Sequence, residues 1–85
     1  MVENNNEKTK ELKFEIINNI GIISEKNKGW KLELNIISWN GNEPKYDIRT
    51  WGPEHKNMGK GITLTNQEII SLYEILSKEV EFLRS

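Results

Sequence analysis

The strongest indications of the fold lie between Ser38 and Leu64, in the sequence SWNGNEPKYDIRTWGPEHKNMGKGITL. Near its start lies Asn40-Gly41, a dipeptide that is favoured in tight hairpin turns. Lys45 to Trp51 then alternates as a strand does, and Gly52 to Gly59 reads as a loop. The short run Ile62 to Leu64 predicts a last strand that leads directly into a helix. Consecutive strands with short connections predict an antiparallel sheet.

Two more strands are predicted before this stretch. Leu12 to Ser24 is rich in β-branched residues and has a bend or bulge expected at Gly21, and Glu25 to Gly29 reads as a polar turn. Trp30 to Trp39 then shows the cleanest alternation in the chain. One of its faces carries Trp30, Leu32, Leu34 and Ile36, and the other carries Lys31, Glu33, Asn35, Ile37 and Trp39. We expect Leu32, Leu34 and Ile36 in the core, and Trp30 in the core or at a dimer contact rather than at a ligand.

A C-terminal helix is predicted from Thr65 onward. Thr65 and Glu68 have the spacing of a capping box. An apolar stripe at helical spacing follows, made of Ile69, Leu72, Tyr73, Leu76, Val80 and Leu83. Ile70, Ile75 and Phe82 lie outside that stripe and widen the apolar surface beyond what a four-stranded sheet needs. We therefore predict an α+β fold of four strands and one helix, in which the helix covers the sheet and also contacts a second subunit.

The size and composition of the chain favour a homodimer. Its 85 residues make one domain, and a chain this short buries only about 60 to 65% of its unfolded surface. It contains no cysteine, so neither disulfides nor thiolate-bound zinc can add stability. Residues 1–11 are polar and are predicted to form a disordered tail before a domain spanning residues 12–85. No signal peptide or membrane-spanning run is evident, which predicts a cytoplasmic protein with no membrane partner.

The charge of the chain is unevenly distributed. The net charge is −1, but residues 28–60 carry five Lys and one Arg against three Glu and one Asp, which gives +2. Residues 61–85 carry one Lys and one Arg against four Glu, which gives −2. The predicted strands are thus basic and the helix acidic. A polyanion partner is compatible with this pattern, with moderate affinity and strong salt sensitivity.

Aromatic and cationic side chains share the face predicted to point outward. If Ile48 packs inward, the outward row of its strand is Lys45, Asp47, Arg49 and Trp51, on the same face as Lys31 and Trp39. Bases stack on aromatic rings with about 1–3 kcal/mol each, and only when they are not already stacked in a duplex. Arg49 can hold a phosphate through two parallel hydrogen bonds or stack on a base. With Trp39 and Trp51 exposed, this face predicts sequence-tolerant binding of single strands.

The same segment carries a family resemblance. The strand Lys45-Tyr46-Asp47-Ile48-Arg49, then Trp51, then Lys60-Gly61-Ile62-Thr63-Leu64 before a helix, resembles the positive-cofactor-four transcriptional coactivators, and most closely their short bacterial YdbC-type members. The similarity runs from about Phe14 to Phe82. It implies a single-stranded DNA-binding homodimer that acts in transcription or strand handling. It also implies a curved four-stranded antiparallel sheet with one C-terminal helix packed on one face. The predicted DNA-binding residues are Lys31, Trp39, Lys45, Arg49, Trp51, Lys56 and Lys60.

Other interpretations of these residues remain open. Asp47 could pair with its neighbours on the strand, and Trp39 and Trp51 could be ordinary half-buried strand residues. The rival functions are RNA binding, because neither stacking nor phosphate contact inspects the 2′-hydroxyl, and a protein-interaction module that uses the same face. The one histidine, His55, has no cysteine or second histidine beside it, so we expect no metal, no cofactor, no small-molecule substrate and no enzymatic activity.

Overall fold

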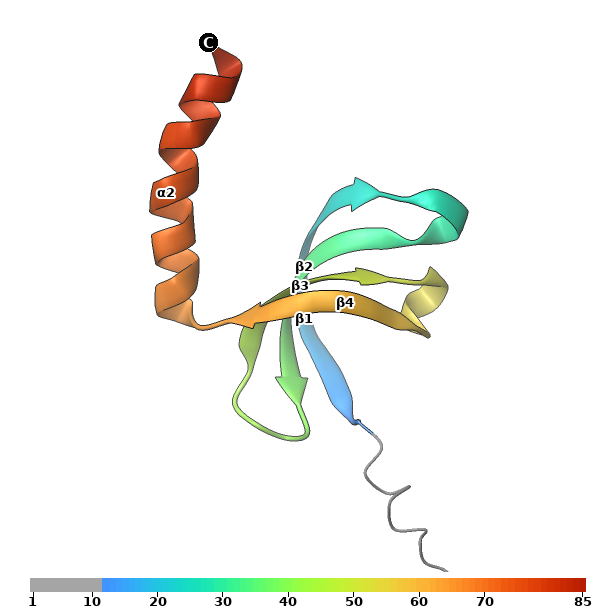
Figure 1. Cartoon of the computed structure of the whole chain (residues 1–85). Helices are drawn as coiled ribbons and strands as arrows, with labels where there is room; N and C mark the ends of the chain where they lie inside the picture. The colour runs from blue at the N-terminus through green and yellow to red at the C-terminus, as the bar shows by residue number, and fades with distance from the viewer. Residues whose placement is uncertain (1–11) are drawn as a thin grey trace, which may run out of the picture.

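The computed structural model describes residues 12–85 as four strands and one α-helix (Figure 1). The elements are β1 (Phe14–Glu25), the 3₁₀ turn η1 (Asn27–Gly29), β2 (Lys31–Trp39), β3 (Lys45–Trp51), the 3₁₀ turn η2 (Pro53–His55), β4 (Met58–Leu64) and α2 (Asn66–Arg84). The strands form one antiparallel sheet in the order β1-β2-β3-β4. The predicted four-stranded sheet with one C-terminal helix is therefore confirmed. The tail predicted for residues 1–11 lies outside the described residues.

The predicted turns form where the sequence tolerates a left-handed backbone. Asn40 and Gly41 both have positive φ, 52° and 78°, as a tight hairpin between β2 and β3 requires. The Asn40 side chain also accepts a hydrogen bond from the Lys13 backbone N–H, so this turn is attached to the start of β1. The β1–β2 connection uses Lys28 and Gly29 in the same way. Each connection joins neighbouring strands, which explains the simple strand order.

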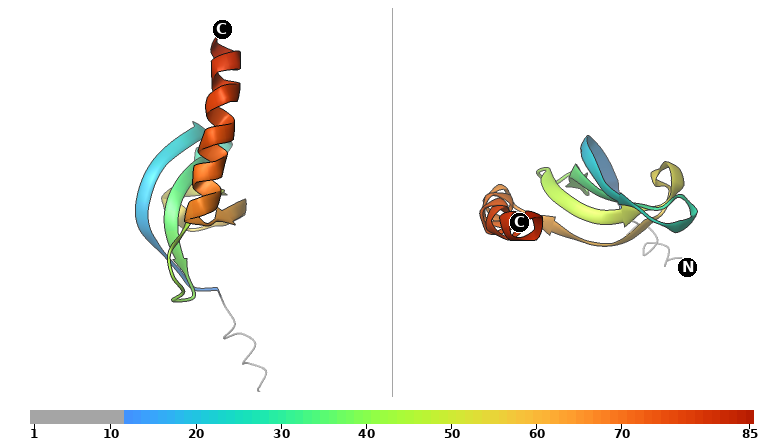
Figure 2. Two further views of the ribbon diagram at one scale, coloured as in Figure 1. Left: turned by 90° about the vertical axis from the view of Figure 1, so that its left-hand side faces the viewer. Right: turned by 90° about the horizontal axis from the view of Figure 1, so that it is seen from above.

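The sheet is strongly curved (Figure 2). The β1–β2 pairing shifts register at three places, and such bulges bend a strand. Phe14 pairs with Trp39 at one end of β2, whereas Trp51 pairs with Lys31 at the other end, about 26 Å away along an extended strand. Yet the ring centroids of Phe14 and Trp51 are 5.3 Å apart. The two ends of the sheet therefore bend toward each other over the face that carries these rings, which we name the concave face.

Within residues 12–85, the buried side chains lie on this concave face. They are Glu33, Asn35, Ile37, Asp47 and Trp51, each at most 3% exposed. The prediction that this face points to solvent is wrong, and Leu32, Leu34 and Ile36, predicted to form the core, are only partly buried on the opposite, convex face. The reason is the curvature, because a bent sheet brings the side chains of its inner face together and spreads those of its outer face.

The helix α2 starts as predicted but covers little of the sheet. Thr65 and Glu68 form the capping box, with each side chain bonded to the other residue's backbone N–H. The helix contacts β3 and β4, and its C-terminal half extends beyond the sheet (Figure 1). No residue of α2 is buried. The radius of gyration is 16.2 Å, against about 11–12 Å for a compact chain of this size.

An open apolar surface lies between the helix and the convex face. Its residues are Ile23, Leu34, Ile48, Ile69, Leu72, Tyr73 and Leu76. Further along the helix Leu83 is 79% exposed and Phe82 77%, values that are unusual for large apolar side chains in a folded domain. The helix and the convex face thus leave a continuous apolar area exposed.

Candidate functional site

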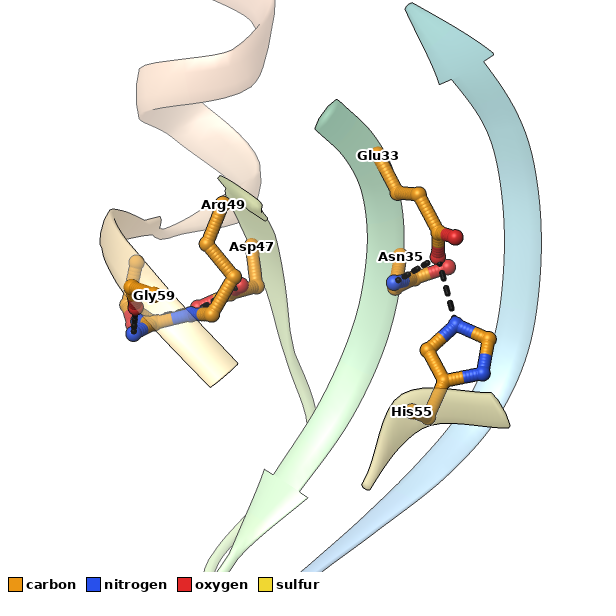
Figure 3. Close-up of polar contacts among 7 residues, drawn as sticks. Glu33, Asn35, Asp47, Arg49, His55 and Gly59 are labelled. Carbon is orange, nitrogen blue, oxygen red and sulfur yellow. Dashed lines mark hydrogen bonds and ion pairs between the residues drawn. The ribbon is translucent and has the colours of Figure 1, made fainter. Parts of the chain in front are cut away.

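Arg49 and Asp47 form a rigid ion pair on the concave face (Figure 3). Arg49 Nε donates to Asp47 Oδ1 at 2.7 Å, and Nη2 donates to Oδ2 at 2.8 Å. Asp47, fully buried, also accepts from Thr63 Oγ1 at 3.1 Å, and Arg49 Nη1 donates to the Gly59 carbonyl at 3.2 Å. The two parallel hydrogen bonds that were expected to hold a phosphate are thus made to Asp47. The alternative in which Asp47 pairs along the strand is confirmed for Arg49.

The Arg49 guanidinium also lies over the indole of Trp39. Its central carbon is 4.9 Å from the ring centroid, a cation–π geometry. Because Asp47 and Gly59 hold the guanidinium in place, Arg49 and Trp39 form one fixed stack. The side chain of Arg49 is 14% exposed. This stack is the feature of the concave face best suited to a planar base.

A row of aromatic rings continues from this stack across the concave face. The ring centroids of Trp39 and Phe14 are 5.9 Å apart, those of Phe14 and Trp51 are 5.3 Å apart, and those of Trp51 and His55 are 5.2 Å apart. Trp51 is only 1% exposed, so the prediction that it stands in solvent is wrong. Trp51 lies under Phe14 and His55 because the curvature brings the strand ends together. In this row Phe14 is exposed, and Trp39 and His55 are half-buried.

The predicted lysines are spread over β2, β3, β4 and the loop after η2. Lys31 pairs with Trp51 across the sheet and is half-buried, and Lys45 is exposed and pairs with Ile37. Lys60 is exposed on β4 and lies in the register shift opposite Thr50. The next residue, Gly61, pairs with Arg49. Lys56 is exposed in the loop after η2, 3.5 Å from Glu54. Register therefore places Lys31 and Lys45 on the concave face, as predicted, whereas Lys60 lies on the edge strand β4 and Lys56 in the loop before it.

Two glycines of β4 allow the close approach that positions Arg49. A Cβ on Gly61 would overlap the Cβ of Arg49, and a Cβ on Gly59 would overlap the Thr50 hydroxyl. Trp30, predicted to pack rather than to touch a ligand, lies against the same region, since a Cβ on Gly52 would be 3.3 Å from its ring. Gly61 of the KGITL string thus has a steric role, because it lets β4 lie directly against the side chain of Arg49, and Gly59 does the same for Thr50.

A second polar cluster surrounds Glu33. Its Oε1 accepts hydrogen bonds from Asn19 and Asn35 at 3.1 Å each and lies 2.8 Å from His55 Nε2 (Figure 3). Burial raises the pKa of Glu33, but the bonds from His55, Asn35 and Asn19 outweigh burial and hold that pKa below its usual value. Glu33 is therefore an anion at neutral pH, fixed beneath the aromatic row.

Similarity to known proteins supports the family resemblance. Residues 26–75 match the family described as Transcriptional Coactivator p15 (PC4). The chain belongs to the PC4 family. A protein of Treponema pallidum (strain Nichols) described as uncharacterized is 50% identical to it over 64 residues, which cover 75% of this chain and 75% of that protein. The PC4 match spans β2, β3, β4 and the start of α2, and so contains Arg49, Asp47 and Trp39.

Sequence reasoning missed two residues of this PC4-type face. Phe14 alternates with Ile16 and was assigned to an apolar strand, and only the curvature of β1 brings its ring onto Trp51. His55 lay in a loop with no metal-ligand partner, and nothing in the local pattern pointed to Glu33, which is 22 residues away. Phe14 lies before the residues that match the PC4 family. Motif strings alone could not predict its contact with Trp51, because contacts across the sheet depend on strand register.

Residues 12–85 show neither a metal cluster nor a membrane span. No group of three or more His, Cys, Asp or Glu side chains in this part of the PC4-type chain is placed to hold a metal ion. The described helix is not long and apolar enough to cross a membrane.

Proposed function

We propose that the chain binds single-stranded DNA on its concave face, with little dependence on base sequence, in transcription regulation or in strand handling during replication and repair. The observation that carries the proposal is the Trp39–Arg49 stack, which lies among lysines on a face that the helix leaves open. Membership of the PC4 family, whose members bind single-stranded DNA, supports it. A role like that of the short bacterial YdbC-type members, in the cytoplasm, is part of the same proposal.

Stacking and charge are divided between different residues in this proposal. Trp39 and Arg49 form the flat surface on which a base stacks, and Trp51 supports the neighbouring rings from beneath. The lysines contact phosphates as mobile point charges; they are Lys31, Lys45, Lys56 and Lys60. Because Asp47 neutralises Arg49, the salt dependence of binding arises from the lysines.

The aromatic row must open for bases to enter it. Phe14 and Trp51 contact each other directly, and their contact occupies space that a base would need. Among residues 12–85, the buried Asn35 Oδ1, Trp39 Nε1 and Trp51 Nε1 have no hydrogen-bond partner in the protein, and all three lie on the concave face. Buried polar atoms without partners are uncommon, and opening would let them bond to a nucleotide. Such opening costs free energy and predicts moderate affinity.

A homodimer built on the helix completes the proposal. The apolar area of α2 and the convex face is large and faces away from the aromatic row. Its burial against a second copy would leave both concave faces free for DNA. The uneven charge distribution is consistent with this arrangement, because the acidic helix would lie away from the phosphates.

Fluorescence anisotropy with a labelled oligothymidylate tests the proposal. At low salt we expect binding to the single strand and much weaker binding to a duplex of the same sequence. Equal binding of both, or no binding of either, would contradict it. An oligouridylate of the same length measures the preference for DNA over RNA, since neither stacking nor phosphate contact inspects the 2′-hydroxyl. Sedimentation with and without oligonucleotide measures the number of subunits per strand.

A further inference from the structure

His55 is held in a fixed position at the end of the aromatic row. Its backbone has φ of 56° and follows Glu54 at 57°, so the turn η2 aims this side chain back over the sheet. The ring is 5.2 Å from Trp51 in an edge arrangement, and Nε2 lies 2.8 Å from Glu33 Oε1. The side chain of His55 nevertheless remains 37% exposed. It is therefore a rigid group whose outer part meets solvent at the concave face.

Glu33 determines which nitrogen of His55 is available to a ligand. The carboxylate is 4% exposed and is an acceptor only, so the nitrogen beside it, Nε2, carries the hydrogen. Asn19 and Asn35 also donate to this carboxylate, which keeps it from turning away. The other nitrogen, Nδ1, then presents a lone pair when the ring is neutral and an N–H donor when the ring is protonated. Only the protonated ring attracts a phosphate.

We propose that His55 is a further nucleic-acid contact, that its protonated Nδ1 donates to a phosphodiester oxygen of the bound strand, and that Glu33 is its positioning residue. This inference rests on the proposed single-stranded DNA binding. The proton is taken up from solvent on binding and stays on the imidazole, and no covalent bond changes. Binding of DNA and of one proton to the protein are therefore coupled, and each strengthens the other.

The charged groups around His55 leave Glu33 as its direct partner. On β3, Asp47 and Arg49 are bound to each other. On its own turn, Glu54 and Lys56 lie 3.5 Å apart and are more than three-quarters exposed. On β2, Lys31 stands beside Trp51 across the sheet, and Glu25 of β1 pairs with Lys31. The β1 residue that donates to Glu33 is the uncharged Asn19.

Calorimetric titration of the full chain with oligothymidylate tests this inference. Measured at constant ionic strength in two buffers of different ionisation enthalpy, it reports the protons taken up on binding. We expect uptake of a fraction of one proton near neutral pH, and affinity that rises about fivefold to tenfold from pH 8 to pH 6. The chain has a single histidine, so His55→Gln is expected to abolish both effects. Lys78→Gln removes a lysine that is exposed on α2, outside the proposed DNA-binding face, and is the control expected to keep both.

The outcomes separate this inference from the proposed function. Binding without proton uptake by the unaltered protein would overturn the role of His55 and leave DNA binding intact, and so would a pH dependence that persists in His55→Gln. Absence of binding at every pH would overturn the proposed function itself. Glu33→Gln gives a second check, because a positioning role predicts that the pH dependence weakens while the fold, followed by circular dichroism, is retained. If His55→Gln does not fold, proton uptake by the unaltered protein decides the question.

Discussion

Arg49 has a formal positive charge that Asp47 already neutralises. Its two parallel hydrogen bonds to Asp47 hold the guanidinium against Trp39, and little of the group is exposed. Arg49 therefore contributes shape and polarisability to the concave face, and the lysines contribute charge. The motif alone could not separate these roles, because an arginine on a strand is equally suited to either.

Removal of the ion pair as a unit tests this division. Asp47→Ala combined with Arg49→Ala leaves the net charge unchanged and leaves neither partner buried alone. We expect weaker oligothymidylate binding, by roughly tenfold for the loss of about 1–3 kcal/mol of stacking, with the same slope of log affinity against log salt. Lys45→Ala is the matched comparison and is expected to reduce that slope by about 0.7. A reduced slope in the double variant would show that Arg49 does contact phosphate.

The lowered pKa of Glu33 predicts that the protein loses stability in acid. Its pKa in the folded chain is lowered below the ordinary 4.5, so it adds stability above that pH, and this contribution disappears as pH falls through the lowered pKa. Urea denaturation between pH 7 and pH 3 should show a steeper loss in the unaltered protein than in Glu33→Gln. Parallel curves for the two proteins would contradict the assigned direction.

At the scale of elements, the β3–β4 pair depends on the absence of a side chain at Gly61. Gly61→Ala would force the two strands apart where Arg49 Cβ lies, and overpacking of this kind costs about 1–3 kcal/mol. We expect a lower free energy of unfolding in urea and, because Arg49 shifts away from Trp39, weaker DNA binding.

Gly21→Ala is the matched control for that substitution. A Cβ at Gly21 meets nothing within 4 Å, and the position does not need a positive φ. We expect its stability to stay the same or rise slightly, because alanine is the better strand residue. Equal losses in the two variants would show that close approach at Gly61 is not the cause.

At the scale of the whole molecule, the exposed apolar helix predicts association. Leu76 lies in the middle of the stripe on α2 and is 46% exposed in the single chain. If two copies join through this stripe, Leu76→Glu should yield monomers in sedimentation and a lower thermal midpoint that no longer rises with protein concentration. Ser71→Glu, on an exposed part of the same helix, is expected to leave the assembly unchanged. A monomeric unaltered protein would contradict the proposed dimer.

The elements and their faces followed from the sequence by itself. Asn40-Gly41 specified a hairpin because both residues tolerate positive φ, and Thr65 with Glu68 specified the start of the helix. Strict alternation also placed Arg49, Asp47 and Trp51 on one side of β3, since side chains on a strand repeat every two residues.

Which face of the sheet is buried, concave or convex, could be learned only from the folded structure. Alternation says which side chains share a face but not toward which face the sheet bends. That direction depends on the bulges of β1 against β2 and on rings such as Phe14 and Trp51, which meet only after the strands have paired. The contact of His55 with Glu33 has the same origin, because it joins a turn to a strand 22 residues away through the curvature between them.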